Sequence, residues 1–411
     1  MNQNVFVILL IACGLLFKIQ ISYAQESTVD TSKVRVLRID PATANGGSMS
    51  QVFEEIDFIP LQSTKESMFG DIKQLETTEN FYIIFDDDTK CILIFDKNGI
   101  FKNKINIGKI IGGKIDPQDI DVHSFKLVDS KLIEFSTSNK AYKFDTEGKQ
   151  IGEPIDIKRE HISNETYFFK DSTYIESYFK VNSNFLYQYV YLKQGKIKSK
   201  YFKLETGKNS SEGDFAVGGP SFIQTTENGK LYGVRNYDYN IYQLDNNGIS
   251  IAFRLIFPSK NTLPKDFNTN KIYKGKRLQY FFKNAENIFG IGYTYGIGDY
   301  LYFKCGSLSS NIRKNGSFVY DLKNDYLISL NRLDPDSLSH NLPIIGTWDN
   351  DFKKFDGNYL YASLSSLELF SFYEQVKKKN PQYPIAMQNY FKKGSKKDNP
   401  VLIRLKPKRV S

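Results

Sequence analysis

Three polar side chains alternate with two apolar ones in the segment DIDVH. Asp119, Asp121 and His123 flank Ile120 and Val122. Because successive side chains of a β-strand point to opposite faces, the three polar groups would share one face of a strand. Two carboxylates and an imidazole at this spacing predict a ligand or cation site. The alternative, which we favour, is that they cap the start of a strand, since structural polar clusters often resemble sites.

Two other segments carry groups that bind ligands in other proteins. Trp348, the only tryptophan, lies in GTWDND and could present its ring at a loop surface, as carbohydrate sites do. Partly buried packing is the alternative that we favour. The run Asp86-Asp87-Asp88 offers carboxylates of the kind that calcium needs, but it lacks the spaced acids and the glycine of a calcium loop. We therefore interpret it as a solvated hairpin turn.

Motifs for common chemistries are mostly missing. The stretch GIGYTYGIGDY, residues 290–300, resembles an anion-binding loop, but an aromatic strand follows it where such a loop needs a helix. Its glycines are therefore expected to permit close backbone packing or bulges. The chain has no G-x-S-x-G, P-loop, H-E-x-x-H or C-x-x-C motif and only three histidines. These observations favour a binding protein over an enzyme.

The first residues predict export. Val5 to Phe17 is apolar apart from Cys13 and Gly14, and this run is shorter than the ~20 residues that span a bilayer. It fits a signal peptide, residues 1–24, with small residues at Ser22 and Ala24 before the cleavage site. A second interpretation is a lipobox, Leu10-Ile11-Ala12-Cys13, with an acylated Cys13. We expect ordinary cleavage and no membrane span.

Composition limits the class of partner and indicates which interactions stabilise the fold. The 411 residues carry a formal net charge of +9, which falls to +8 when Lys18 leaves with the signal peptide. We expect this surplus to be spread along the chain, densest at Lys377–Lys379 and from Lys392 to Arg409. In an exported protein it favours an acidic glycan or lipid surface over nucleic acid, unless it is merely solvated. Only Cys91 and Cys305 follow the leader, so burial of apolar and aromatic side chains must hold the fold.

A repeating unit organises the chain after a polar tether at residues 25–50. Each unit has an aromatic or aliphatic strand, a polar turn, a second strand that ends in an acidic turn with glycine, and an outward strand. The first five copies begin at Tyr82, Lys131, Tyr174, Lys230 and Tyr300. The turn glycines Gly99, Gly148, Gly195 and Gly248 are 49, 47 and 53 residues apart, which is typical of one four-stranded propeller blade per repeat. In this frame DIDVH is expected on the innermost strand of the second blade.

Two insertions and the two ends of the chain complete the prediction. Residues 258–284 are expected to contain some helix, and residues 365–397 interrupt a sixth copy that begins at Tyr359. Leu367, Phe370 and Tyr373 partly follow helical spacing there, and Pro381 and Pro384 end the helix. NPVLIRLKP, residues 399–407, would be the third strand of the last blade and EEIDFIPLQST, residues 54–64, its outermost one. The predicted fold is an all-β six-bladed β-propeller at residues 51–408, closed by pairing of N- and C-terminal strands.

Three segments resemble a known family. EEIDFIPLQST, CILIFDKNGIFKNKINIG (residues 91–108) and DNPVLIRLKPK (residues 398–408) are similar to NHL-like six-bladed β-propellers that Bacteroidetes-type bacteria export or anchor as lipoproteins. The likeness covers residues 50–408 and implies the fold and export. Where that family often has a G-x-G-P-G-E-Y-like segment, this chain has GKIIGGKIDPQDI, residues 108–120, so no role is transferred to it.

The sequence therefore predicts an exported, non-enzymatic binding or interaction scaffold of the cell envelope. It would be periplasmic, secreted or associated with the outer membrane, and its partner would be an envelope protein or a glycan rather than nucleic acid. Asp119, Asp121, His123 and Trp348 are the candidate ligand-binding residues. The alternative is a metal-dependent lyase or hydrolase with its site at the mouth of the propeller channel, as some other NHL-like propellers are. Cofactor and metal stay open.

Overall fold

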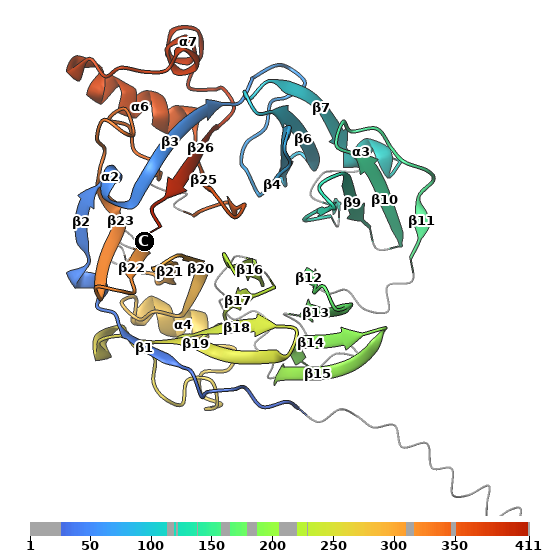
Figure 1. Cartoon of the computed structure of the whole chain (residues 1–411), viewed down its shortest axis with the longest axis vertical. Coiled ribbons are helices and arrows are strands. Elements are labelled where there is room, and N and C mark those ends of the chain that lie inside the picture. Colours follow the sequence, from blue (N-terminus) through green and yellow to red (C-terminus); the bar gives the residue numbers. More distant parts are fainter. Residues whose placement is uncertain are drawn as a thin grey trace, which may run out of the picture.

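A computed structural model describes most of the chain as one ring of β-sheets (Figure 1). The described residues are 26–112, 119–120, 122–137, 139–157, 165–178, 187–204, 220–227, 229–309, 316–346 and 351–409. The predicted signal peptide and the lipobox cysteine lie outside these ranges. Six sheets radiate from a common axis, so the predicted six-bladed β-propeller is confirmed.

The first three blades each consist of four antiparallel strands, and each blade runs from the axis outward in chain order. Blade 1 contains β4 (Gln74–Thr77), β5 (Phe81–Asp86), β6 (Cys91–Asp96) and β7 (Phe101–Asn106). Blade 2 contains β8 (Lys126–Val128), β9 (Leu132–Ser136), β10 (Lys140–Asp145) and β11 (Ile155–Asp156). Blade 3 contains β12 (Glu165–Phe168), β13 (Thr173–Ser177), β14 (Tyr187–Lys193) and β15 (Lys196–Lys203).

Blades 4 and 5 repeat this plan, and blade 6 combines the two ends of the chain. Blade 4 contains β16 (Ile223–Gln224), β17 (Leu231–Gly233), β18 (Asn240–Asp245) and β19 (Gly248–Ile256). Blade 5 contains β20 (Gly290–Ile297), β21 (Tyr300–Gly306), β22 (Ser317–Asp321) and β23 (Tyr326–Asp334). Blade 6 contains β24 (Lys354–Phe355), β25 (Leu360–Leu364), β26 (Val401–Pro407) and, outermost, β3 (Phe53–Pro60).

The closure of the ring follows the predicted strand pairing. β26 is the third strand of blade 6, and it pairs antiparallel with both β25 and β3. Arg404 on β26 donates to the Asp57 carboxylate on β3 at 2.9 and 3.1 Å. Each terminal strand is therefore paired within blade 6, and this pairing closes the ring.

Residues 26–52 form a belt around the outside of the ring, where composition predicts a free tether. Within this belt β1 (Arg35–Arg38) pairs parallel with β19, and β2 (Asn45–Ser48) pairs parallel with β23. Blades 4 and 5 therefore each gain a fifth strand. The short helices η1 (Pro41–Thr43) and α2 (Met49–Val52) connect β1, β2 and β3. The belt covers the outer edges of blades 4 and 5 before the chain enters blade 6.

The two ends of the propeller differ in their connections. The turns from the first to the second strand and from the third to the fourth lie at one end, which we call the turn face. Asp96, Asp145 and Asp245 there each accept hydrogen bonds from backbone amides two to four residues later, at 2.8–3.3 Å. Gly99 and Gly148 complete the same turns at φ of +79° and +84°, as the acidic turn of the repeat predicts.

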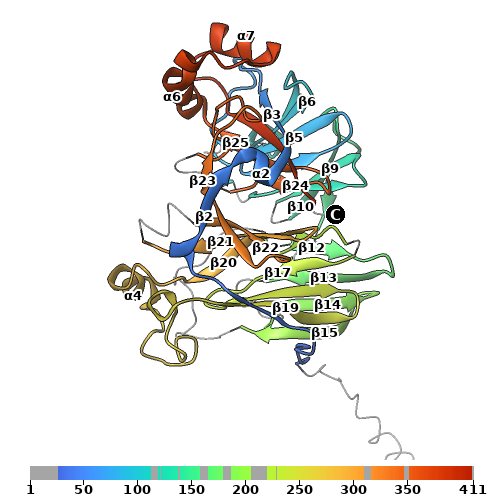
Figure 2. The ribbon, with the colours of Figure 1, turned by 60° about the vertical axis from the view of Figure 1, so that its left-hand side comes forward.

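The other end, which we call the insertion face, holds the connections from the second to the third strand and from each blade to the next. Its helices are α3 (Ile107–Ile110), η3 (Ser259–Asn261), α4 (Arg277–Lys283), α6 (Ser366–Val376), η4 (Lys377–Lys379) and α7 (Ile385–Lys393). Both predicted insertions are confirmed, and α7 is an additional helix after Pro384. Figure 2 shows that α4 and α6 project to the same side of the ring.

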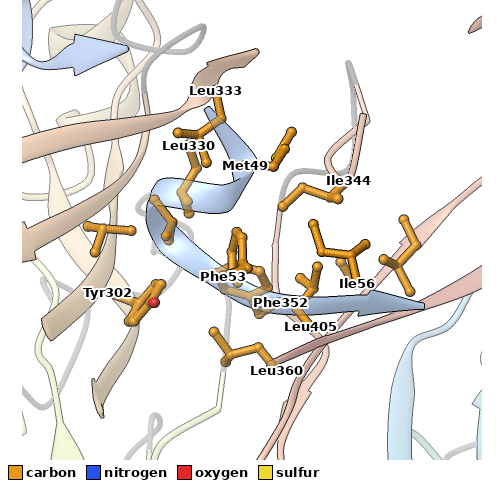
Figure 3. Packing of buried hydrophobic residues seen from close by; sticks show 14 of the residues in the cluster. Met49, Phe53, Ile56, Tyr302, Leu330, Leu333, Ile344, Phe352, Leu360 and Leu405 are labelled. Atoms are coloured by element: carbon orange, nitrogen blue, oxygen red, sulfur yellow. The ribbon is translucent and has the colours of Figure 1, made fainter. Parts of the chain in front are cut away.

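The core lies between neighbouring blades rather than at the axis. Its largest cluster joins blades 5 and 6 to the belt (Figure 3). Met49 at the end of the belt and Phe53 at the start of β3 pack between Leu330 of blade 5 and Leu405 of blade 6, and all four are buried. Leu369 of α6 and Met387 of α7 reach the same cluster and are fully buried. The helical insertion is therefore anchored to the propeller body.

Candidate functional site

The predicted ligand residues lie on the connection from blade 1 to blade 2. Ile120 and Val122 are buried, whereas Asp119 and His123 are exposed. The segment is not the innermost strand of blade 2, because β8 begins only at Lys126. The prediction failed there because two buried apolar residues can anchor a blade connection as well as a strand. Asp121 and Trp348 lie outside the described residues.

His123 contacts the hairpin turn of blade 1. Its Nδ1 lies 3.5 Å from Asp87 Oδ1 and 3.3 Å from Lys90 Nζ. Lys90 is almost completely buried, and its Nζ donates to Asp87 Oδ1 at 2.6 Å and to the carbonyl oxygen of Val122 at 3.0 Å. Burial would raise the pKa of Asp87, but hydrogen bonds and charge from Lys90 and His123 bring it below its usual value. This contact fastens the blade connection to the hairpin.

The Asp86–Asp88 run forms the predicted turn between β5 and β6, but it is not uniformly solvated. Asp86 is buried and accepts from the backbone amide of Thr89 at 3.1 Å, whereas Asp88 is exposed. The glycines of residues 290–300 serve close packing as predicted, since a Cβ on Gly296 would lie 2.7 Å from the Tyr232 ring. Neither segment presents a ligand site.

Ionisable side chains of three blades meet around the axis of the ring. Glu76 on β4 of blade 1 accepts from Lys354 Nζ on β24 of blade 6 at 2.6 Å. Glu165 is the first residue of β12 in blade 3. The charges of both Glu76 and Lys354 act on it, which brings the three residues into one electrostatic group. We call Glu76, Glu165 and Lys354 the axial cluster. The three strands that carry these residues begin at the insertion face.

Glu165 is the member of this cluster whose pKa is shifted. Its Oε2 accepts from the backbone amide of Phe222, the residue before β16, at 3.0 Å. Among the described residues no lysine or arginine forms an ion pair with it. Burial raises the pKa of Glu165 to about 7, aided by the negative charge of Glu76, although backbone hydrogen bonds and Lys354 oppose the shift. The carboxyl group is therefore partly protonated near neutral pH, and it can both donate and accept a proton.

The equivalent position of blade 1 explains what Glu165 does structurally. Gln74 is the first residue of β4, and its side-chain amide both donates to the carbonyl oxygen of Phe125 and accepts from its backbone amide, at 2.9 and 3.1 Å. Phe125 precedes β8 as Phe222 precedes β16. Both side chains therefore join the start of one blade to a neighbour. Only the protonated form of Glu165 could reproduce the donor and acceptor pair of Gln74.

A second ionic contact lies between blades 5 and 6. Lys304 on β21 forms an ion pair with Asp351, and its Nζ lies 5.7 Å from the centre of the Tyr293 ring. These residues line a cavity of about 10 Å³, together with Phe303, Ser317, Leu330 and Phe352. Such a volume holds about one water molecule, so this cavity is too small for an organic ligand.

Metal binding and thiol reactivity are two further chemistries that the described residues bear on. Within the described ranges no three His, Cys, Asp or Glu side chains gather as a metal site would require. Cys91 and Cys305 are free and buried in different clusters, and burial raises the pKa of both thiols. No helix of the described part is both long and apolar enough to cross a bilayer.

Sequence reasoning missed the axial cluster, because nothing in the local sequence marks its members. Glu76 lies in the stretch QLETTE, Glu165 in NETYF and Lys354 in FKKF, and none resembles a motif. The signal that could have found them is the position of each residue in the repeat. Each residue belongs to the short segment that precedes an aromatic repeat copy, which is where a propeller has its innermost strand.

Comparisons with known proteins support the fold. A family model described as "Domain of unknown function (DUF4934)" matches residues 34–406. No curated protein matches the chain. A solved structure described as a "Putative exported protein" from Bacteroides fragilis has a TM-score of 0.63 at 14% identity, over 91% of this chain and 100% of its own. This likeness confirms the propeller fold over nearly the whole chain.

Two further solved structures score lower. A member of the DUF4221 family from Bacteroides vulgatus has a TM-score of 0.43 at 13% identity, over 87% of this chain and 98% of its own. The structure of a streptogramin B lyase has a TM-score of 0.32 at 12% identity, over 66% and 71%. At these scores neither likeness adds to the fold assignment or bears on activity.

Proposed function

The chain belongs to the DUF4934 family, and from this premise we propose that it is an exported, non-enzymatic binding scaffold of the cell envelope. The insertion face is its ligand-contacting surface, and the axial cluster is the polar centre of that surface. The observation that carries the proposal is the grouping of Glu76, Glu165 and Lys354 around the axis, from three separate blades. Ring folds commonly bind partners through the loops of one end, on a rigid frame.

The chemistry of the axial cluster suits a polar partner. A carboxyl group with a pKa of about 7 offers both a donor and an acceptor, and Lys354 adds donors beside it. An envelope glycan or a polar protein loop has matching hydroxyl and amide groups. Asp119 and His123, on a connection of the same face, would extend the contact, and Asp121 and Trp348 remain candidates on the sequence argument.

Photo-crosslinking in intact cells tests the choice of face. A benzoylphenylalanine at Ser124, exposed on the insertion face, should give a specific adduct with an envelope component. The same probe at Lys131, exposed on the turn face, should give none. Adducts from Lys131 alone, or a protein retained in the cytoplasm, would contradict the proposal.

A glycan array tests the polar centre. Purified mature protein should bind some envelope glycans, and the Glu165→Met, Lys354→Met double variant should bind them at least about tenfold more weakly, since two hydrogen-bonding groups are lost. The Lys131→Met, Lys149→Met double variant on the turn face is the matched control. Equal loss in both variants would contradict a role for the axial cluster.

A second candidate is a lyase or hydrolase with a metal ion at the channel mouth. The pKa of about 7 at Glu165 favours it, because a general acid or base works best when its pKa lies near the working pH. Zinc or calcium bound in stoichiometric amount, together with turnover of an array glycan that Glu165→Gln abolishes, would establish this activity in place of the scaffold.

A further inference from the structure

Two insertions are strongly basic. Residues 257–289 contain seven basic and two acidic residues, and residues 365–400 contain seven basic and three acidic ones. Together they account for the complete formal charge of +9, because the remaining 41 basic and 41 acidic residues cancel. Other segments are basic too, since residues 193–208 contain six basic residues and one acidic residue. The surplus is therefore spread along the chain as expected, and the two insertions are two of its dense regions.

These lysines are available to a partner. Twelve of them are exposed: Lys260, Lys265, Lys271, Lys276, Lys283, Lys377, Lys378, Lys379, Lys392, Lys393, Lys396 and Lys397. Among these twelve, only Lys377 forms an ion pair with a described residue, Glu374. The single arginine of the two insertions, Arg277, is buried and packs its guanidinium over the rings of Tyr237 and Phe267.

The same two insertions expose apolar side chains. Ile385 is 76% exposed, Phe282 70%, Ile272 63% and Leu367 56%. These are four of the five most exposed large apolar side chains of the described residues; the fifth, Phe168 at 67%, ends β12 at the turn face. Exposed apolar side chains beside basic ones are typical of surfaces that contact a partner.

Both insertions are fixed to the body and lie at one end of it. Phe281 of α4 is fully buried, as are Leu369 of α6 and Met387 of α7. Tyr373 of α6 stacks on Phe391 of α7 with ring centres 4.0 Å apart, which holds the two helices together. One insertion connects blades 4 and 5 and the other connects β25 and β26, so chain topology puts both on the insertion face (Figure 2).

We infer that the insertion face docks peripherally on an anionic lipid surface. Lysines provide point charges that suit the diffuse negative field of anionic headgroups, and the exposed isoleucine, leucine and phenylalanine side chains would enter the interfacial layer. A soluble acidic glycan has no place for isolated aliphatic side chains. Phosphates of nucleic acid are typically recognised by exposed arginines and stacked aromatic rings, and the insertions have no exposed arginine. The inference uses different residues from the axial cluster and stands independently of it.

Vesicle sedimentation of the mature protein tests this inference. Binding to vesicles of phosphatidylcholine mixed with phosphatidylglycerol should be strong and should weaken with added salt, and binding to pure phosphatidylcholine should be weak. The variant Lys378→Glu, Lys379→Glu, Lys393→Glu should lose roughly a hundredfold in affinity or more, because about 1 kcal/mol accompanies each lysine near such a surface. Lys131→Glu, Lys149→Glu, Lys323→Glu, on exposed turn-face lysines, is the control with the same charge change and should bind like the wild type.

The apolar side chains distinguish a lipid surface from a soluble polyanion. Phe282→Ser with Ile385→Ser should weaken vesicle binding at every salt concentration, whereas Phe168→Ser on the turn face should leave it unchanged. All variants should keep the thermal unfolding midpoint of the wild type, since the changed side chains are exposed. Equal binding to both kinds of vesicle, or binding to heparin with none to vesicles, would overturn the inference. Charge variants that weaken binding while the apolar variants do not would also overturn it, in favour of a soluble acidic polymer.

Discussion

The turn face and the insertion face are built from the same strands but follow different rules. At the turn face an aspartate and a glycine define the reversals after β6, β10 and β18, so the sequence there is limited by backbone geometry. At the insertion face several connections are long, and two of them are the strongly basic insertions with helices α4, α6 and α7. The repeat therefore encodes the frame through one end of the ring and leaves the other end free to diverge.

Removing the last strand should destroy both faces at once, and it is the largest effect that we expect. Deletion of residues 399–411 takes β26 from between β25 and β3 and breaks the ring. The exposed strand edges and the opened core should abolish cooperative folding. Thermal unfolding followed by circular dichroism measures this. A truncated chain that melts as sharply and at the same temperature as the full chain would contradict the role of the closure.

The geometric rule of the turn face can be tested at two glycines. Gly99 and Gly195 have similar φ angles, +79° and +74°, but a Cβ at Gly99 would lie 2.3 Å from the carbonyl oxygen of Pro60, whereas none of the described atoms lies within 4 Å at Gly195. Gly195→Ala should cost about 1 kcal/mol of unfolding free energy, and Gly99→Ala about 3 kcal/mol because its clash with backbone adds to the unfavourable φ. Urea titration measures both. Equal costs would show that φ alone matters.

Glu165 should make the insertion face sensitive to pH. Its folded-state pKa of about 7 exceeds the ordinary value of 4.5, so the native protein keeps a proton that the unfolded chain has released. The free energy of unfolding should therefore fall by up to about 3 kcal/mol as pH rises from about 4.5 to 7. It should not change further above pH 7. Glu165→Gln should remove this dependence. If the difference in unfolding free energy between the two proteins is constant over that pH range, the shift is absent.

A buried lysine can be compared with an exposed one at Lys90 and Lys102. Lys90→Met leaves Asp87 and the Val122 carbonyl oxygen without their buried donor and should cost about 2 kcal/mol. The turn-face pair Lys102–Asp96, 2.8 Å apart with a much more exposed lysine, is the control, and Lys102→Met should cost less than about 1 kcal/mol. Chemical unfolding of both variants measures the comparison. A cost at Lys102 that equals that at Lys90 would contradict it.

The blades could be predicted from the sequence because each contributes a local pattern. β5, β6, β9 and β10 alternate or run together as apolar strands, and their turns carry aspartate and glycine. The closing strands β26 and β3 were also identifiable, since each has an apolar strand pattern without a partner nearby in sequence. These features depend on short-range order, which one sequence displays directly.

The belt and the axial cluster could not be predicted because they depend on partners far away in sequence. β2 reads Asn-Gly-Gly-Ser and pairs through its backbone, and a Cβ on Gly46 would lie 2.7 Å from the carbonyl oxygen of Arg332. Such a strand has no side-chain pattern. The properties of Glu165 arise from burial and from a backbone amide 57 residues away, at Phe222. DIDVH, in contrast, has a conspicuous local pattern that the structure explains by two buried apolar anchors.

The pairing of β3 with β26 also governs how the protein can fold. Asp57 and Arg404 are separated by 347 residues, so the entropy of closing that loop is lost only when the final strand arrives. During synthesis β3 leaves the ribosome early and must wait unpaired while the other five blades form. We therefore expect slow, late ring closure, in keeping with the slow folding of chains dominated by distant contacts. The belt, whose partners are β19 and β23, cannot dock before blades 4 and 5 exist. The first segment to be made is thus among the last to become native.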